Sequence, residues 1–343
     1  MDSITHIVMG AAIGDTLLGK KAGRKAALAG AFLKTFPDFD LFISGLSDNR
    51  KYILYHRSHT HAFLVEFLCA FPLALIFYFL FRKRISYKEW FMLSLVCLWG
   101  HSIVDVFTNY GTRLFLPFTN QLYSLNNISI VDLIFTVPML LFVLVGLFFK
   151  NQSRGRMVCM RSSLLYAVLY LCLTFFNKIQ ADKVFRTSLK AKQTPYTSYM
   201  SNPTILNNLL WYSLATTRDS LYVGLYSLLE DSRTPEWRVY ARHTELLDKH
   251  PSTKDIQLLT WFSQGYYICN RREDTLDFYA VKFGPTSFRQ SDTSAEKFFL
   301  FYYKLYTRDG KEILDFRQPS QSKEDFGRAF DELLDRIAGK KIK

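Results

Sequence analysis

The sequence predicts an α-helical multi-pass membrane domain of about six segments, followed by a small α+β soluble domain. Hydrophobic residues make up 49% of the 343 residues, but they are concentrated in the first half of the chain. Apolar runs there reach the length of about 20 residues that crosses a bilayer core. No comparable run follows Lys178. This change in composition predicts a transmembrane domain at 1–180 and a second domain at 181–343.

Four membrane spans are predicted from apolar runs that are flanked on both sides by charged or turn-forming residues. They cover residues 62–81, 90–107, 130–149 and 160–177. Two shorter segments precede them at 4–19 and 24–36. Both are rich in glycine and alanine, which suits helices packed tightly inside a membrane bundle, with partial or tilted insertion left open.

The distribution of basic residues predicts the orientation. Much of the net charge of +13 lies in short joins between apolar segments, where it indicates topology rather than nucleic-acid binding. Because Lys and Arg favour the cytoplasm, the joins near 20–25, 82–88 and 150–161 are assigned to that side. Six crossings then place the N-terminus and the second domain in the periplasm of a bacterium. The first residues lack the basic region of a signal peptide, so we expect them to stay on the mature protein.

The second domain has the pattern of a small sheet with a closing helix. Alternating segments rich in Tyr, Phe and Val predict strands at 221–229, 275–283 and 298–306. Apolar residues at helical spacing predict a helix over 323–337. Nothing in this domain indicates catalysis, so we expect it to cap a site or to present a surface to a partner.

Histidines are concentrated where the chemistry is expected. Five of the seven lie in the first 101 residues, and the predicted topology brings them to one membrane face: His6, His56, His59, His61 and His101. His101 and Asp105 are four residues apart on a predicted helix, so both can bind one cation. Imidazole and carboxylate ligands suit a catalytic Zn2+ with a position open for water. Ionisable groups in so apolar a run are costly, which favours a functional role.

Carboxylates and one arginine complete the predicted site. Asp38 and Asp40 are two residues apart and cannot share a helical face, so one is expected to bind the metal and the other to orient a ligand histidine. The sequence leaves open which does which. The predicted metal ligands are His6, Asp38 or Asp40, His61, His101 and Asp105. His56 and His59 are weaker candidates, and Arg57 suits either an anionic substrate or a lipid headgroup.

These motifs resemble a known family, the bacterial membrane-bound metal-dependent hydrolases of the LexA-regulated inner-membrane type. The resemblance covers about residues 1–180 and rests on MDSITH at the start with Gly10, PDFD at 37–40, HRSHTH at 56–61, and GHSIVD at 100–105 with Thr108 and Gly111. Leu116 to Phe118 and Asp132 also look like family features, which adds Asp132 as a weaker metal candidate. One departure is Ser58-His59, where the family usually has a glycine after the arginine. It leaves open whether His59 replaces a backbone role or adds a ligand.

The resemblance implies a multi-pass protein with a metal-dependent hydrolase site at the predicted ligands. A more distant likeness to zinc-dependent phospholipase C favours phosphoester substrates. We therefore expect an inner-membrane hydrolase that acts at the periplasmic face on a lipid or lipid-linked phosphoester. One or two divalent ions, with zinc expected, would activate a water. A spare carboxylate of Asp38 or Asp40 would accept a proton, and Arg57 would stabilise negative charge.

Two non-enzymatic functions are the alternatives. One is a metal or proton transporter that uses the same His/Asp cluster, and the other is a membrane scaffold for the second domain. A transporter is expected to place ionisable residues near the midplane and on both sides of it, whereas the predicted cluster lies at one face. The sequence does not indicate an oligomeric state.

Overall fold

A computed structural model describes residues 1–41, 49–81, 83–248, 253–289, 294–299, 301–318 and 323–342. Arg82, one of the basic residues in the predicted cytoplasmic joins, lies outside these ranges. The chain divides into two compact units, Met1–Thr174 and Phe175–Lys343. The first unit is helical, and the second is rich in β-structure.

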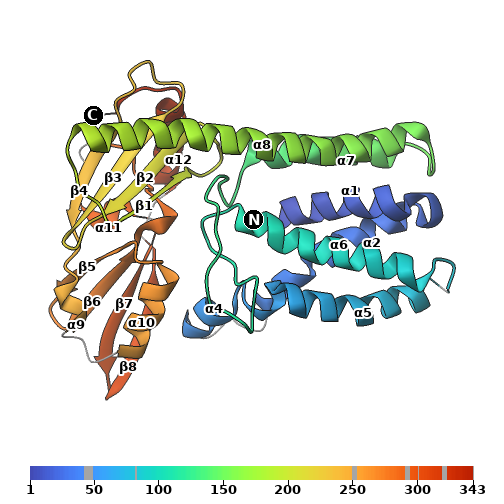
Figure 1. Cartoon of the computed structure of the whole chain (residues 1–343), viewed down its shortest axis with the longest axis horizontal. Helices are drawn as coiled ribbons and strands as arrows, with labels where there is room; N and C mark the ends of the chain where they lie inside the picture. The colour runs from blue at the N-terminus through green and yellow to red at the C-terminus, as the bar shows by residue number, and fades with distance from the viewer. Residues whose placement is uncertain are drawn as a thin grey trace. The chain divides into compact units, whose positions relative to one another are not determined.

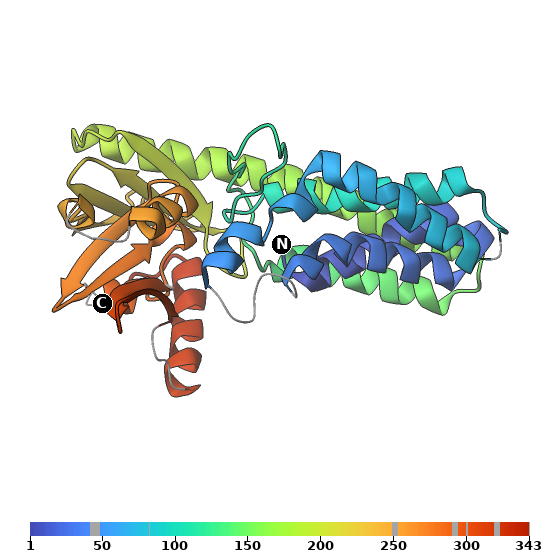
Figure 2. The same ribbon diagram turned by 90° about the horizontal axis from the view of Figure 1, so that it is seen from below.

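The first unit is a bundle of helices that run alongside one another (Figures 1 and 2). It contains α1 (Ser3–Ala22), α2 (Arg24–Thr35), α5 (Phe63–Leu80), α6 (Tyr87–Val106), α7 (Leu133–Phe148) and the first part of α8 (Arg154–Ala191). Between α2 and α5 lie the 3-10 turns η1 (Phe36–Phe39) and η2 (His59–His61) and the short helix α4 (Asn49–Tyr55). Helices are therefore present at all six predicted segments.

Three of the described helices are long and apolar enough to cross a membrane, namely α5, α6 and α8. Helix α7 is apolar but has only 16 residues. Helix α2 has 12 residues, and α1 carries Asp15, Lys20 and Lys21, which lower its apolar character. The helical N-terminal region with three candidate spans is thus confirmed, and the count of about six crossings stays a prediction.

Glycines allow α1 and α2 to pack closely. A Cβ atom on Gly10 would lie 2.4 Å from the carbonyl oxygen of Gly30, and one on Gly30 would lie 2.1 Å from the carbonyl oxygen of Gly10. Any side chain at either position would force the helices apart. The close packing predicted from the small residues is confirmed, and it presses the last turn of α2 against α1.

The helix ends and the joins between helices lie at two opposite ends of the bundle. The start of α1, the end of α2, the start of α5 and the end of α6 lie at one end, and the α1–α2, α5–α6 and α7–α8 joins lie at the other (Figure 1). In the first turn of α8, next to the α7–α8 join, Arg156 is buried and its Nε donates to Asp15 Oδ2 at 2.9 Å. Its Nη1 also donates to Asn151 at 3.0 Å, so Arg156 links α8 to α1 rather than acting as a free loop charge.

The second unit contains two four-stranded antiparallel sheets, each with its strands in sequence order. The first holds β1 (Ser198–Pro203), β2 (Leu210–Thr216), β3 (Ser220–Ser227) and β4 (Glu236–Ala241), and the second holds β5 (Tyr267–Arg272), β6 (Thr275–Ala280), β7 (Tyr302–Arg308) and β8 (Lys311–Arg317). The helices are α9 (Glu245–Asp248), α10 (Thr253–Phe262), η3 (Val281–Phe283), α11 (Ala295–Phe298) and α12 (Lys323–Ile337). A β-sheet-rich C-terminal domain is therefore confirmed.

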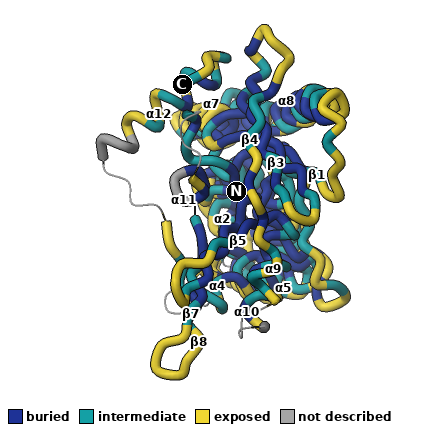
Figure 3. The backbone as a smooth tube through the Cα atoms, turned by 90° about the vertical axis from the view of Figure 1, so that its left-hand side faces the viewer, coloured by how far each residue is buried: buried dark blue, intermediate teal, exposed yellow. Residues whose placement is uncertain are grey.

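The first sheet of this unit is covered on both faces. Leu214 of β2 and Tyr279 of β6 belong to one core cluster, and Leu333 of α12 joins it. On the other face, Phe185 of α8 packs in a second cluster with Trp211 of β2, where α8 lies along the sheet (Figure 1). Strand β2 is buried over its whole length. The turn between β7 and β8, by contrast, is exposed (Figure 3).

Candidate metal centre

The turn that ends α2 presents two carboxylates. Pro37 stands in the first turn of η1, where its missing N–H costs nothing and its fixed φ suits the helical conformation. Asp38 follows inside η1, and Asp40 is the C-cap residue. Both side chains are buried. The short turn therefore delivers Asp38 and Asp40 to the end of the bundle where α1, α5 and α6 meet.

Four buried side chains converge at this end: Asp38 from η1, His61 from η2, and His101 and Asp105 from α6. One ligand atom from each lies within 4.8 Å of all the others. Asp38 Oδ1 is 3.5 Å from His61 Nε2 and 3.4 Å from His101 Nε2. Asp105 Oδ2 is 3.3 and 3.4 Å from the same two nitrogens. Two oxygens and two nitrogens thus surround one point and could bind one cation.

The Nδ1 atoms of His61 and His101, which point away from the cluster, have partners of their own. Nδ1 of His101 lies 2.5 Å from the carbonyl oxygen of Lys34, to which it donates. Nδ1 of His61 lies 3.0 Å from Thr60 Oγ1 and 3.5 Å from Asp40 Oδ2. These contacts leave both Nε2 atoms facing the cluster, as the outer partners of metal-binding histidines commonly do.

Asp40 organises the HRSHTH stretch instead of facing the cluster. Its Oδ1 lies 3.0 Å from His56 Nδ1. Its Oδ2 accepts hydrogen bonds from the backbone N–H of Arg57 and from Thr60 Oγ1, both at 3.0 Å. The sequence left open which aspartate binds the metal, and the structure places Asp38 at the cluster and Asp40 behind His61.

The charges of these groups follow from burial and from their partners. Burial alone would raise the pKa of Asp38, but the adjacent imidazoles of His101 and His61 hold it well below its usual value. Burial opposes a charged His61, but the carboxylates of Asp105 and Asp38 outweigh burial and raise its pKa. Asp38 is therefore ionised at neutral pH, and His61 takes up a proton more readily than a free histidine does.

The second carboxylate oxygen of Asp105 faces a different set of groups. His6 Nε2 and Arg57 Nη2 each lie 3.2 Å from Oδ1, and the amino group of Met1 also contacts it. The ring of His6 stacks on that of His101 with centroids 3.8 Å apart. Arg57 is buried, has a positive φ of 54°, and donates to Thr108 Oγ1 at 2.9 Å. His6 and Arg57 thus lie beside the four-residue cluster.

The cluster fits a divalent metal ion. Asp105 Oδ2 is buried and accepts no hydrogen bond from the described residues, although two imidazole nitrogens face it. A buried carboxylate oxygen without a donor is costly unless a cation lies nearby. Two imidazoles and two carboxylates form a donor set that Zn2+ and other first-row divalent ions accept. The residues could therefore bind a metal, whose identity the geometry does not determine.

Comparison with known proteins places the chain in a family. Residues 1–181 match the family model of the YdjM inner membrane protein. The chain belongs to the YdjM inner membrane protein family. The four converging residues lie within the matched range, and the inner-membrane family predicted from the motifs is confirmed, while the hydrolase activity stays a prediction. An inner-membrane family agrees with the helices that could cross a membrane.

One curated relative is similar over a longer stretch. The chain is 25% identical over 234 residues to the uncharacterized protein YfhP of Bacillus subtilis (strain 168), which covers 65% of this chain and 68% of YfhP. Because this match is longer than residues 1–181, part of it lies in the second unit. No solved structure is significantly similar.

The three weaker metal candidates of this family member lie outside the four-residue group. His59 is exposed, with Nδ1 3.1 Å from Ser58 Oγ. His56 lies against Asp40. Asp132 is buried, accepts a hydrogen bond from Phe135 N at 3.0 Å as the N-cap of α7, and accepts another from Tyr170 at 2.9 Å. These contacts give His56 and Asp132 structural partners.

Two buried charged residues near the cluster were not predicted. Lys34 and Glu66 are 0% and 1% exposed. Ser102 donates to Glu66 Oε1 at 2.6 Å, and a Cβ on Gly100 would lie 3.0 Å from Lys34 Nζ. Ser102 and Gly100 flank His101, so both charged residues border the site. The available signal was that Glu66 is the one charged residue in the apolar run 62–81.

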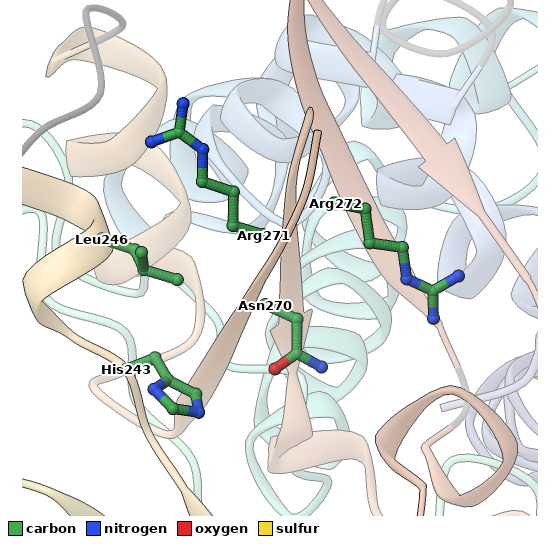
Figure 4. Close-up of a pocket in the computed structure, with 5 residues that line it drawn as sticks. All are labelled: His243, Leu246, Asn270, Arg271 and Arg272. Carbon is green, nitrogen blue, oxygen red and sulfur yellow. The ribbon is translucent and has the colours of Figure 1, made fainter. Parts of the chain in front are cut away.

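The second unit holds a cavity of about 380 Å³, lined by His243, Leu246, Asn270, Arg271 and Arg272. Arg271 and Arg272 are adjacent on β5 and point away from each other (Figure 4). The five lining residues therefore do not direct their charges toward one ligand, unlike the four residues of the metal centre.

Proposed function

We propose that this protein is a membrane-bound metal-dependent hydrolase that acts on a lipid or lipid-linked phosphoester. The observation that carries the proposal is the convergence of Asp38, His61, His101 and Asp105 on one point, with Arg57 beside it. A buried set of two nitrogens and two oxygens supports a divalent metal, for which zinc is the ion we expect. A buried guanidinium supports an anionic substrate group such as a phosphate.

The surroundings of Asp105 support one ion rather than two. Its Oδ2 faces the imidazole nitrogens, whereas its Oδ1 faces the guanidinium of Arg57 and the amino group of Met1. A second divalent cation on the Oδ1 side would be repelled by Arg57. We infer that this side receives the negatively charged part of the substrate.

When bound, a divalent metal lowers the pKa of a water ligand and polarises a phosphoryl oxygen. Arg57 would donate hydrogen bonds to the substrate oxygens as negative charge develops. Asp40 would keep the HRSHTH stretch and His61 in position, because its oxygens already accept several hydrogen bonds. His6 Nδ1 is buried and has no hydrogen-bond partner among the described residues, so His6 is placed to hold a proton beside the reacting group.

The test measures metal and activity separately. Detergent-purified wild type should contain about one divalent metal per chain by elemental analysis, and Asp105→Asn should contain almost none. Hydrolysis of phosphatidic acid and of a polyprenyl diphosphate should then depend on the metal. Arg57→Lys is the matched variant, because it keeps a positive charge but loses the two-pronged geometry. It should retain the metal and lose hydrolysis.

Two results would contradict the proposal. A wild type that takes up no added Zn2+ or Mn2+ would contradict the proposed metal binding. A metal-loaded wild type that hydrolyses neither phosphoester would remove the proposed substrate class.

The periplasmic orientation is part of the proposal and has its own support. The basic joins α1–α2, α5–α6 and α7–α8 lie at the end of the bundle opposite the cluster (Figure 1), and basic joins favour the cytoplasm. Alkaline phosphatase fused after residue 343 should therefore be active, since that enzyme needs an oxidising compartment to form its disulfides. Activity of a cytoplasmic reporter at the same position would reverse the orientation.

A transporter is less well supported by the buried charges. Asp15 and Arg156 are buried at the end of the bundle away from the cluster, but they neutralise each other in a two-point contact. Lys34 lies in the last turn of α2 and Glu66 in the first turn of α5, so both lie at the end that holds the cluster. These positions favour one chemical site at one end over a pathway.

A further inference from the structure

An apolar turn projects from the segment between α6 and α7. The backbone N–H groups of Phe118 and Thr119 donate to the carbonyl oxygen of Phe115 at 2.9 and 3.2 Å, which closes the turn. Phe118 at its tip is 80% exposed, and Phe115 is 44% exposed. Two large aromatic side chains on one exposed turn are unfavourable in water, so this turn is expected to have an apolar partner.

The turn is held firmly at its base. Leu114 and Leu116 are buried, whereas Phe115, Pro117 and Phe118 are exposed. Buried and exposed side chains therefore alternate from Leu114 to Pro117. The carbonyl oxygen of Leu114 accepts a hydrogen bond from Phe63 N at 2.9 Å, at the start of α5. The two phenylalanines therefore project because their neighbours are anchored inward.

The apolar surface of the turn continues onto helices that could cross a membrane. The ring of Phe115 lies 5.8 Å from that of Phe63, which lies 5.5 Å from the ring of Trp99 in α6. Trp99 is partly exposed and its Nε1 donates to the carbonyl oxygen of Phe63 at 3.1 Å. Further along the same helices, Leu68 and Ile103 are exposed. A tryptophan at such a boundary is typical of the membrane–water interface.

We propose that residues 114–118 insert into the interfacial layer of the lipid bilayer, with Phe115 and Phe118 among the lipid chains. The partner is lipid, because the exposed surface of the turn is continuous with the outward surface of α5 and α6. The same segment reaches the metal centre, since Arg113 N donates to the carbonyl oxygen of Arg57 at 3.2 Å. Insertion would thus hold Arg57 at the depth of lipid phosphate groups. The inference does not depend on hydrolase activity.

Nitroxide labels on the full-length protein in lipid nanodiscs test the insertion. Cys69, Cys159 and Cys172 are replaced by serine, and the buried Cys97 and Cys269 are kept. One label replaces Phe118, and the matched control replaces Gln121, which is exposed three residues further on. We expect the label at 118 to collide several-fold more often with oxygen than with a water-soluble nickel chelate, and the label at 121 to show the reverse.

Three results would overturn the proposal. Equal access of the nickel chelate to positions 118 and 121 would place the turn in water. Low access of both reagents at 118 would show that protein covers it. Spectral broadening that disappears on mixing with unlabelled protein would show that a second copy is the partner. A label at Phe115 provides a second probe if the substitution at 118 lowers the yield of folded protein.

Discussion

The Nδ1 atom of His101 lies 2.5 Å from the carbonyl oxygen of Lys34. This contact joins α6 to the last turn of α2, which glycines press against α1. The packing of two small-residue helices therefore determines which nitrogen of His101 faces the cluster. The four-residue centre depends on the bundle as much as on its ligands.

Removing a ligand should remove the metal. His101→Ala and Asp105→Ala each delete one of four donors from a buried group, so metal content should fall from about one per chain to near zero. Expression and elution from a sizing column should stay unchanged. His59→Ala is the control, because His59 is exposed and lies outside the group. An Asp105→Ala protein with full metal content would show that the ion binds elsewhere.

The two neighbouring aspartates should respond differently to the same substitution. Asp38→Asn replaces a donor at the cluster and should abolish binding, whereas Asp40→Asn disturbs the support of His61 and should weaken zinc affinity by about 10- to 100-fold. Competition with a fluorescent zinc chelator measures both affinities. Equal effects, or a larger effect at Asp40, would exchange the roles assigned to the two residues.

Metal binding should weaken on acidification. A proton competes with the metal for His61, whose pKa is raised mainly by the carboxylates of Asp105 and Asp38 against the opposing effect of burial. The zinc affinity should be independent of pH above this pKa and should decline as the pH falls below it, starting at higher pH than for a free histidine. Asp38 stays ionised throughout, because its pKa is lowered. Competition with a zinc chelator at stepwise lower pH measures the affinity, and an affinity that stays constant down to the usual pKa of histidine, about 6.5, would be inconsistent.

The buried pair of Asp15 and Arg156 should matter for stability rather than for the metal. Arg156→Met leaves a buried carboxylate without its partner and should cost about 3–5 kcal/mol, whereas Asp15→Leu with Arg156→Met should cost less. Lys21→Met is the matched control, because the Lys21–Glu89 pair is exposed and should contribute about 1 kcal/mol or less. Thermal unfolding in detergent compares the three. Similar losses of stability for Arg156→Met and Lys21→Met would show that the buried pair contributes no more to stability than the exposed pair.

Local patterns predicted the helices of the first unit well, because apolar runs and small residues specify membrane helices directly. They also located Asp38, His61, His101 and Asp105, since each stands in a recognisable short motif. Lys34 and Glu66 were missed because the sequence does not show which residues of a neighbouring helix an isolated charged side chain contacts. Which of Asp38 and Asp40 faces the cluster likewise depends on the backbone geometry of η1, which spacing does not reveal.

In the second unit, three strands were predicted near β3, β6 and β7, and the predicted range 323–337 coincides with α12. Strand β2 was missed because it is buried on both faces and has no polar alternation. The last membrane span was predicted at 160–177, and helix α8 extends beyond it to Ala191, because residues after the apolar run still form helix and pack on β2 through Phe185.

That continuation of α8 has a practical consequence for anyone who wishes to produce the second unit alone. Asn177 donates to Asn208 at 3.0 Å, and Lys178 donates to the carbonyl oxygen of Ser201 at 2.8 Å, so the sheet uses polar groups of the helix as well as Phe185. A fragment that begins after Ala191 would leave Trp211 exposed to water and should aggregate. A fragment long enough to fold carries part of an apolar helix with it, so a secreted, detergent-free version of this unit will need a redesigned helix surface.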